Sequence, residues 1–217
     1  MKRYILKVLV LGAAVASSAA FAKKDGYEFS AGTGSAWSYE EDITIKRDGE
    51  KDIDLGLVNF DTNPFKSPLY YDLRVSKWKD NSAWEIELIH HKIYAKKGDL
   101  NTSNTEVSKF EITDGYNLLY GNYAQEVSPG NIARFGVGLV IPHPDVIING
   151  ERSHGPYQLG GVAFQAGIEH EFPINDSFIF SIEGKMTYSY AKINIDNGSS
   201  IVPNTAAHLQ FHIKYMP

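Results

Sequence analysis

The stretch Ala206-Ala-His-Leu-Gln-Phe-His-Ile-Lys-Tyr215 decides the fold class. In it, apolar Leu209, Phe211 and Ile213 alternate with polar or ionisable residues. A period of two residues is typical of a β-strand with one apolar and one polar face. Such a strand belongs either to a soluble sandwich, whose apolar face packs in the core, or to a transmembrane barrel, whose apolar face contacts lipid.

Seven further stretches alternate in the same way, and the connections between successive stretches are long and short by turns. The stretches cover roughly residues 27–39, 69–76, 84–95, 109–126, 135–141, 162–169 and 178–188. The first long connection contains a hairpin signal at Asp48-Gly49. We therefore predict an all-β fold, an eight-stranded antiparallel up-and-down transmembrane β-barrel of the outer-membrane type. A soluble periplasmic barrel or sandwich is the alternative that the pattern leaves open.

Residues 1–22 have a basic start, a short apolar core and a small-x-small ending at Ala22. This pattern predicts a secretory signal peptide, followed by the barrel domain at 23–217. Its removal takes away three basic residues and lowers the formal charge from −5 to about −8, so we expect no nucleic-acid partner. The chain contains no cysteine, which excludes disulfides and thiolate chemistry. We expect a monomer in the bacterial outer membrane.

The polar faces of the strands would enclose an ionisable interior if the apolar faces contact lipid. An eight-stranded barrel is just wide enough for side chains to fill it, and buried charges persist when they are paired. We therefore predict a filled lumen and no conducting pore. The residues predicted to face inward are Asp72, Arg74, Glu85, Glu87, Arg134, Gln165, Glu169, Glu183, Lys185, His208, Gln210, His212 and Lys214.

The third predicted strand departs from strict alternation, because Ile89 directly follows Leu88. A β-bulge at this point would turn Ile89 toward lipid. Glu87, His90 and Lys92 would then share the lumen side. Bulges are common at barrel rims and beside active sites.

Four segments carry a resemblance to a known family. They are residues 68–74, Leu-Ile-His-His-Lys-Ile-Tyr-Ala at 88–95, Phe-Glu-Ile-Thr-Asp-Gly-Tyr-Asn-Leu-Leu at 110–119 and Val-Ile-Pro-His at 140–143. These segments resemble outer-membrane lipid A oxidases, except that His91 stands where an acidic residue is expected. The resemblance implies an enzyme that uses dioxygen to oxidise the proximal glucosamine of lipid A to an aminogluconate. Its partner would be the lipopolysaccharide of the outer leaflet.

The resemblance and the predicted topology together indicate a site near the outer rim. The strands that carry His90, Asp114 and His143 are neighbours in an up-and-down barrel, and the first two residues lie at a similar depth. Two imidazoles and a carboxylate suit a divalent metal such as non-haem iron. We expect Glu87, His90, Asp114 and His143 to be catalytic, His90, Asp114 and His143 to hold the metal, and Lys92 and Asn117 to contact sugar or phosphate.

Other cofactors and functions are weighed against this one. Gly32-x-Gly34 lacks the third glycine and the helix of a nucleotide fingerprint, so no nucleotide cofactor is expected. A non-catalytic structural or adhesion barrel of the OmpA type stays open as the alternative. A lipid A acyl hydrolase would need a serine activated by a nearby base, and Ser153 and His154 are adjacent in a loop and so project differently.

Overall fold

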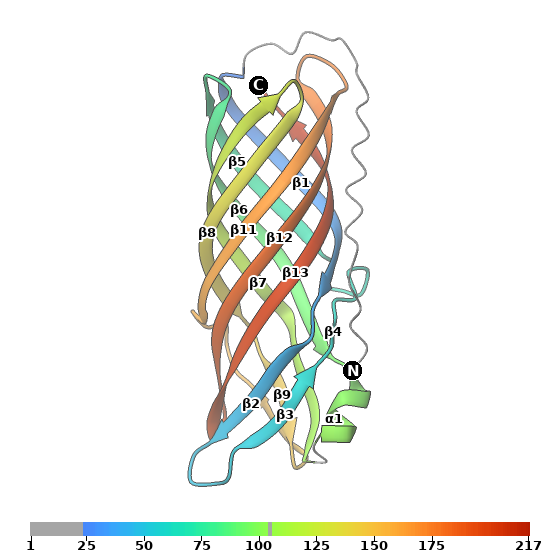
Figure 1. The fold of residues 1–217 in the computed structure, drawn as a ribbon, viewed down its shortest axis with the longest axis vertical. Helices are drawn as coiled ribbons and strands as arrows, with labels where there is room; N and C mark the ends of the chain where they lie inside the picture. The colour runs from blue at the N-terminus through green and yellow to red at the C-terminus, as the bar shows by residue number, and fades with distance from the viewer. Residues whose placement is uncertain (1–23, 104–105) are drawn as a thin grey trace, which may run out of the picture.

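The computed structural model describes residues 24–103 and 106–217 (Figure 1). The predicted signal peptide lies outside the described residues and stays a prediction. Within the described part, eight long strands form a closed ring in which each strand pairs antiparallel with the next and the last pairs with the first. The strands are β1 (Gly26–Ser38), β5 (Tyr71–Lys79), β6 (Ser82–Ala95), β7 (Val107–Ser128), β8 (Asn131–Pro142), β11 (Gly161–Pro173), β12 (Phe178–Ile195) and β13 (Gly198–Tyr215). The predicted eight-stranded barrel is confirmed.

The outer wall of the ring is apolar and the inner wall is polar. On β13, Leu209 and Ile213 are 38% and 49% exposed, whereas Gln210 and His212 are at most 1% exposed. A soluble sandwich would show the reverse, with its aliphatic rows packed inside. An exposed apolar wall around a closed antiparallel ring is the surface that a bilayer covers in outer-membrane barrels. The chain is therefore a membrane-spanning barrel of that type.

Paired charges fill the interior behind this apolar wall. Arg74 lies 2.6 Å from Glu183 and 3.2 Å from Glu169. Arg134 lies 2.8 Å from Glu169 and 2.5 Å from Glu85. All the residues predicted to face inward are buried, which confirms the filled lumen. Buried charges are stable only when they are paired and hydrogen-bonded. Removal of one charged residue would therefore leave its partners uncompensated and destabilise the barrel.

Tight turns join the strands at one end of the barrel, as predicted. In the β5–β6 turn, Asp80 and Asn81 have φ values of 53° and 63°. These left-handed values are what a two-residue hairpin turn needs to match the twist of its strands.

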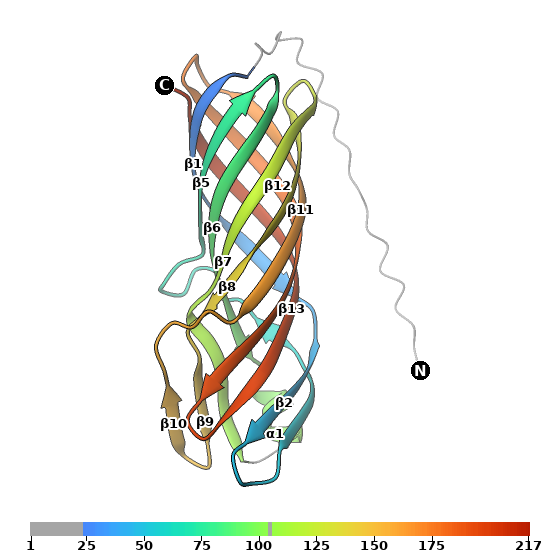
Figure 2. The ribbon, with the colours of Figure 1, turned by 90° about the vertical axis from the view of Figure 1, so that its left-hand side faces the viewer.

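The opposite end carries a folded extension that we call the crown (Figures 1 and 2). It consists of β2 (Glu41–Arg47), β3 (Ile53–Val58), β4 (Phe60–Asp61), α1 (Lys97–Ser103), β9 (Asp145–Ile148) and β10 (Glu151–His154), with the adjoining ends of β6, β7, β12 and β13. The β2–β3 hairpin confirms the predicted turn at Asp48-Gly49. The β9–β10 hairpin lies in a stretch expected to be a loop, and its turn, Asn149-Gly150, has φ values of 51° and 83°. In residues 24–103 and 106–217, no helix is long and apolar enough to cross a membrane.

An apolar core fills the crown and continues into the adjoining end of the lumen. Ile43, Phe110 and Val146 are fully buried in it, in one cluster with Ile89 and Leu118 of the barrel wall. The outer end of the barrel is thus closed by packed side chains.

The predicted bulge near Leu88 and Ile89 is wrong. The pairing of β5 with β6 runs without a shift from Lys79 to Tyr71, and Ile89 is fully buried inside the barrel. Strict alternation therefore turns His90 to the outer wall. The irregularity lies further along, between His91 and Ile93, where the register of β7 shifts.

Candidate functional site

Three side chains that could ligate a metal ion meet on the outer wall where the crown begins. The Nδ1 atom of His143 lies 3.2 Å from Oδ2 of Asp114, and Nε2 of His154 lies 4.0 Å from the same oxygen. One ligand atom from each residue falls within 4.8 Å of the others. We call Asp114, His143 and His154 the outer-wall triad.

The register shift in β7 sets the position of Asp114. Gly115 has a φ of 133°, a value that favours glycine, and an added Cβ would come within 2.5 Å of the Asn117 side chain. The backbone N–H of His143, at the end of β8, donates to the carbonyl of Gly115 over 3.0 Å. This bond holds the two strands together at the point where they present Asp114 and His143.

His154 joins the triad because β9 pairs with β7, next to β8, and β10 folds back along β9. The backbone of His154 pairs with that of Asp145, two residues beyond His143. From the sequence His154 was expected only as the neighbour of Ser153, and its position beside His143 and Asp114 was not predicted. The signal that identifies it is the dipeptide Asn149-Gly150, a strong hairpin marker that brings residues on either side of it together.

Tyr157 supports the triad from the loop between β10 and β11. Its ring stacks on His143 with centroids 4.7 Å apart, and its hydroxyl donates to the backbone carbonyl of Asp114 over 2.6 Å. Within the described residues, Nδ1 of His143 makes no hydrogen bond of proper geometry, although the carboxylate lies close. Two imidazoles and a carboxylate so arranged fit a divalent cation with open positions, as in non-haem iron sites.

His90 is near the outer-wall triad but does not belong to it. Its Nδ1 atom lies 2.7 Å from Oδ1 of Asn117, and its ring stacks on Tyr71 at 4.9 Å with an interplanar angle of 7°. Because the amide oxygen can only accept, Nδ1 carries the proton and Nε2 is left with a lone pair. No hydrogen-bond partner for Nε2 is present in residues 24–103 and 106–217. The structure thus brings together Asp114 and His143 as expected, with His154 in the place expected for His90.

Lys92 and Glu87 both lie apart from the outer-wall triad. Lys92 is 1% exposed, and its ammonium donates to the backbone carbonyls of Asn63 and Lys66. It therefore holds the loop before β5 and is not free to contact a substrate phosphate. Glu87 faces the lumen, as predicted, where it contacts Arg74 at 3.3 Å and Lys185 at 2.5 Å. The barrel wall separates it from the outer-wall triad.

An ion pair braces the hairpin that carries His154. Arg152 donates two hydrogen bonds of 2.8 Å to Asp145, and Lys109 of β7 contacts the same carboxylate. These hydrogen bonds, first from Arg152 and then from Lys109, outweigh desolvation and lower the pKa of Asp145 to about 2. The same contact raises the pKa of Arg152.

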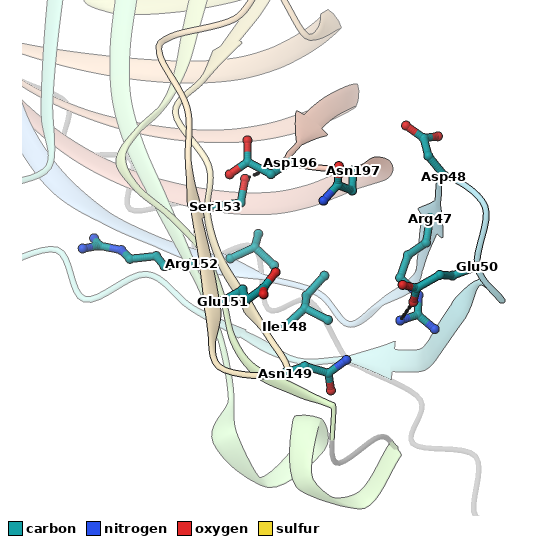
Figure 3. Close-up of a pocket in the computed structure, with 11 residues that line it drawn as sticks. Arg47, Asp48, Glu50, Ile148, Asn149, Glu151, Arg152, Ser153, Asp196 and Asn197 are labelled. Atoms are coloured by element: carbon teal, nitrogen blue, oxygen red, sulfur yellow. Dashed lines mark hydrogen bonds and ion pairs between the residues drawn. The ribbon is translucent and has the colours of Figure 1, made fainter.

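A separate cleft of about 330 Å³ opens at the tip of the crown (Figure 3). It lies between the β2–β3 turn, the β9–β10 hairpin and the β12–β13 turn. Its polar groups largely satisfy one another, since Arg47 pairs with Glu50 at 2.5 Å and Ser153 accepts the backbone N–H of Asp196 over 2.8 Å. Ser153 is thus hydrogen-bonded away from its neighbour His154, which gives no support to a serine hydrolase.

Comparison with known proteins adds only structural neighbours. No protein-family model matches the chain, and no curated protein matches it. Neisserial surface protein A is 7% identical, with a TM-score of 0.47 over 88% of this chain and 97% of that one. The attachment invasion locus protein Ail of Yersinia pestis is 12% identical, with a TM-score of 0.43 over 88% and 99%. The outer membrane protein AlkL is 11% identical, with a TM-score of 0.44 over 92% and 94%.

Proposed function

We propose that this barrel is a lipid A-modifying oxidase whose metal is held by the outer-wall triad. The observation that carries the proposal is the meeting of Asp114, His143 and His154 on the outer wall, next to the apolar surface. The proposal rests also on the resemblance of segments 88–95, 110–119 and 140–143 to lipid A oxidases. The substrate would be the proximal glucosamine of lipid A, which would become an aminogluconate.

The height of the outer-wall triad on the barrel supports a lipid headgroup as substrate. Leu139 of β8 and Val162 of β11 pair with each other and are 42% and 47% exposed in the lipid-facing wall. His143 lies four residues beyond Leu139, toward the crown. Side chains just beyond the hydrocarbon face the layer that holds the headgroups of the outer leaflet. A glucosamine can therefore reach the triad sideways from the membrane.

Each residue of the site has a role that its contacts suggest. A divalent metal, when bound, would supply the binding and activation of dioxygen. Tyr157 holds the ring of His143 and the backbone of Asp114 in place. Asn117 and Tyr71 hold the ring of His90, which is only 4% exposed and has a buried Nε2 atom, so His90 would support the site without contacting the sugar. Oxidation of glucosamine to aminogluconate adds one oxygen atom, which is the change to be measured.

Mass spectrometry of lipid A from cells with and without the protein tests the proposal. We expect a gain of one oxygen with the wild type, and its loss with His143→Ala and with His154→Ala. The control is His170→Ala, because His170 lies on β11 near the opposite end of the barrel, where its ring bonds Asn131 at 2.8 Å. This control should keep the full mass gain, and all variants should show the heat-modifiable migration of a folded barrel.

Other results would favour other functions. Unchanged lipid A in cells that contain the folded wild-type protein would overturn the oxidase and favour a non-catalytic barrel acting through its crown. Loss of an acyl chain would indicate a hydrolase. Full activity of both His143→Ala and His154→Ala would show that the oxidase site lies elsewhere.

A further inference from the structure

Two loops beside the outer-wall triad each present an exposed apolar side chain outside the barrel strands. Phe65, in the loop between β4 and β5, is 83% exposed, and Leu159, in the loop between β10 and β11, is 73% exposed. From these two loops we infer that Phe65 and Leu159 insert into the outer leaflet of the membrane and anchor the barrel there, on either side of the triad. The partner of this surface is the acyl-chain and headgroup boundary of the lipid.

The loop of Phe65 is held rigidly against the barrel. Lys92 donates to the carbonyls of Asn63 and Lys66, and the backbone N–H of Tyr70 donates to the carbonyl of Pro64 over 2.9 Å. Figures 1 and 2 both show this loop projecting sideways from the barrel wall. The two backbone carbonyls compensate the burial of the lysine, so the loop holds Phe65 in a fixed, exposed position.

The loop of Leu159 is also fixed. It precedes β11, whereas the loop of Phe65 precedes β5, so that β6, β7 and β8 lie between the two loops in the ring. The N–H groups of Gln158 and Gly160 donate to the carbonyls of Pro142 and Val140 over 3.0 and 2.8 Å. The side-chain amide of Gln158 donates to the backbone carbonyl of Asn194 and accepts the backbone N–H of the same residue. Leu159 therefore keeps one position at the edge of the lipid-facing wall.

Both side chains continue the apolar wall that the membrane already covers. Phe65 is followed by Leu69, which is 56% exposed, and Leu159 is followed by Val162, which is 47% exposed. Lys66 places an ammonium beside Phe65, 4.7 Å from the centroid of the Tyr94 ring, where it can meet lipid phosphates. An aromatic side chain with an adjacent lysine is a common arrangement at a membrane interface.

Insertion of the two loops would fix the position of the outer-wall triad relative to the membrane surface. Leu159 lies two residues beyond Tyr157, which stacks on His143. If both loops are immersed, the wall between them faces the headgroup layer directly. This consequence rests on the proposed function, whereas immersion itself does not.

Site-directed spin labelling tests the inference on the full chain, which has no native cysteine to interfere. Single variants Phe65→Cys and Leu159→Cys are labelled and placed in phosphatidylcholine vesicles. Two references are Val137→Cys on β8, 58% exposed in the lipid-facing wall, and Leu57→Cys on β3, 60% exposed on the crown. The accessibility of each label to dioxygen, which enters lipid, is compared with that to a polar nickel complex, which stays in water.

We expect the dioxygen-to-nickel ratio at positions 65 and 159 to approach that at 137 and to exceed that at 57 several-fold. Ratios equal to that at position 57 would overturn the inference. Labels shielded from both reagents, and released when the protein is diluted in lipid, would also overturn it in favour of contact with a second copy. The readout needs neither metal nor turnover, so failure of the oxidase proposal leaves it interpretable.

Discussion

The hydroxyl of Tyr157 donates to the backbone carbonyl of Asp114 over 2.6 Å, which links the loop before β11 to the register shift of β7. The same tyrosine stacks on His143. One side chain thus holds two of the three residues of the outer-wall triad at their observed separation.

Tyr157→Phe should weaken binding of a divalent metal about fivefold, because the loss of one hydrogen bond costs about 1 kcal/mol. The phenyl ring still stacks on His143, so the barrel should fold normally. Titration of the purified protein with zinc or ferrous iron measures the effect. Tyr190→Phe, at a half-exposed tyrosine of β12, is the control and should bind as the wild type does. An unchanged affinity in Tyr157→Phe would contradict the positioning role.

Gly115→Ala should destabilise the protein by about 1–3 kcal/mol, because alanine is strained at a φ of 133° and its Cβ would meet Asn117. The triad should lose metal affinity at the same time. Thermal unfolding in detergent and metal titration give the two readouts. Gly184→Ala is the matched control, since nothing lies within 4 Å of its added Cβ. Equal stability of the two variants would show that the β7 irregularity tolerates a side chain.

The stability of the crown should depend on pH through Asp145. Its folded pKa of about 2 is below the value of about 4 in an unfolded chain, so its contribution is present above pH 4 and is lost as the pH falls toward 2. Because Arg152 is exposed, we expect a loss of about 1–2 kcal/mol, less than the full shift implies.

Thermal unfolding between pH 5 and pH 2 measures this dependence. Asp145→Asn should be less stable than the wild type at pH 5 and should lose less stability on acidification. Parallel curves for the two proteins would mean that other carboxylates dominate.

Arg74→Ala should destabilise the barrel by about 3–5 kcal/mol, since it leaves Glu183, Glu169 and Glu87 with an uncompensated charge in the lumen. The temperature at which the protein loses its folded electrophoretic migration should drop accordingly. Lys79→Ala, at the exposed end of the same strand, should change that temperature little. A small effect of Arg74→Ala would indicate that water or protons replace the missing charge.

The sequence by itself determined the barrel and the content of its lumen. Alternation with period two assigns each residue of a strand such as β13 to one wall, and a bilayer requires the apolar wall to face outward. The same rule placed Arg74 and Glu87 inside without knowledge of their partners. It also placed Asp114 and His143 on neighbouring strands.

Only the tertiary structure decided which side chains form the outer-wall triad. Alternation is interrupted where the register shifts, and the shift lies at Gly115 instead of at Leu88. His90 therefore points away from the lumen, where it is buried against Tyr71. His154 enters the site through a hairpin in the crown, a contact between residues on different elements. Strand periodicity is a local property of the backbone, whereas the meeting of Asp114, His143 and His154 depends on how three separate elements fold onto one another.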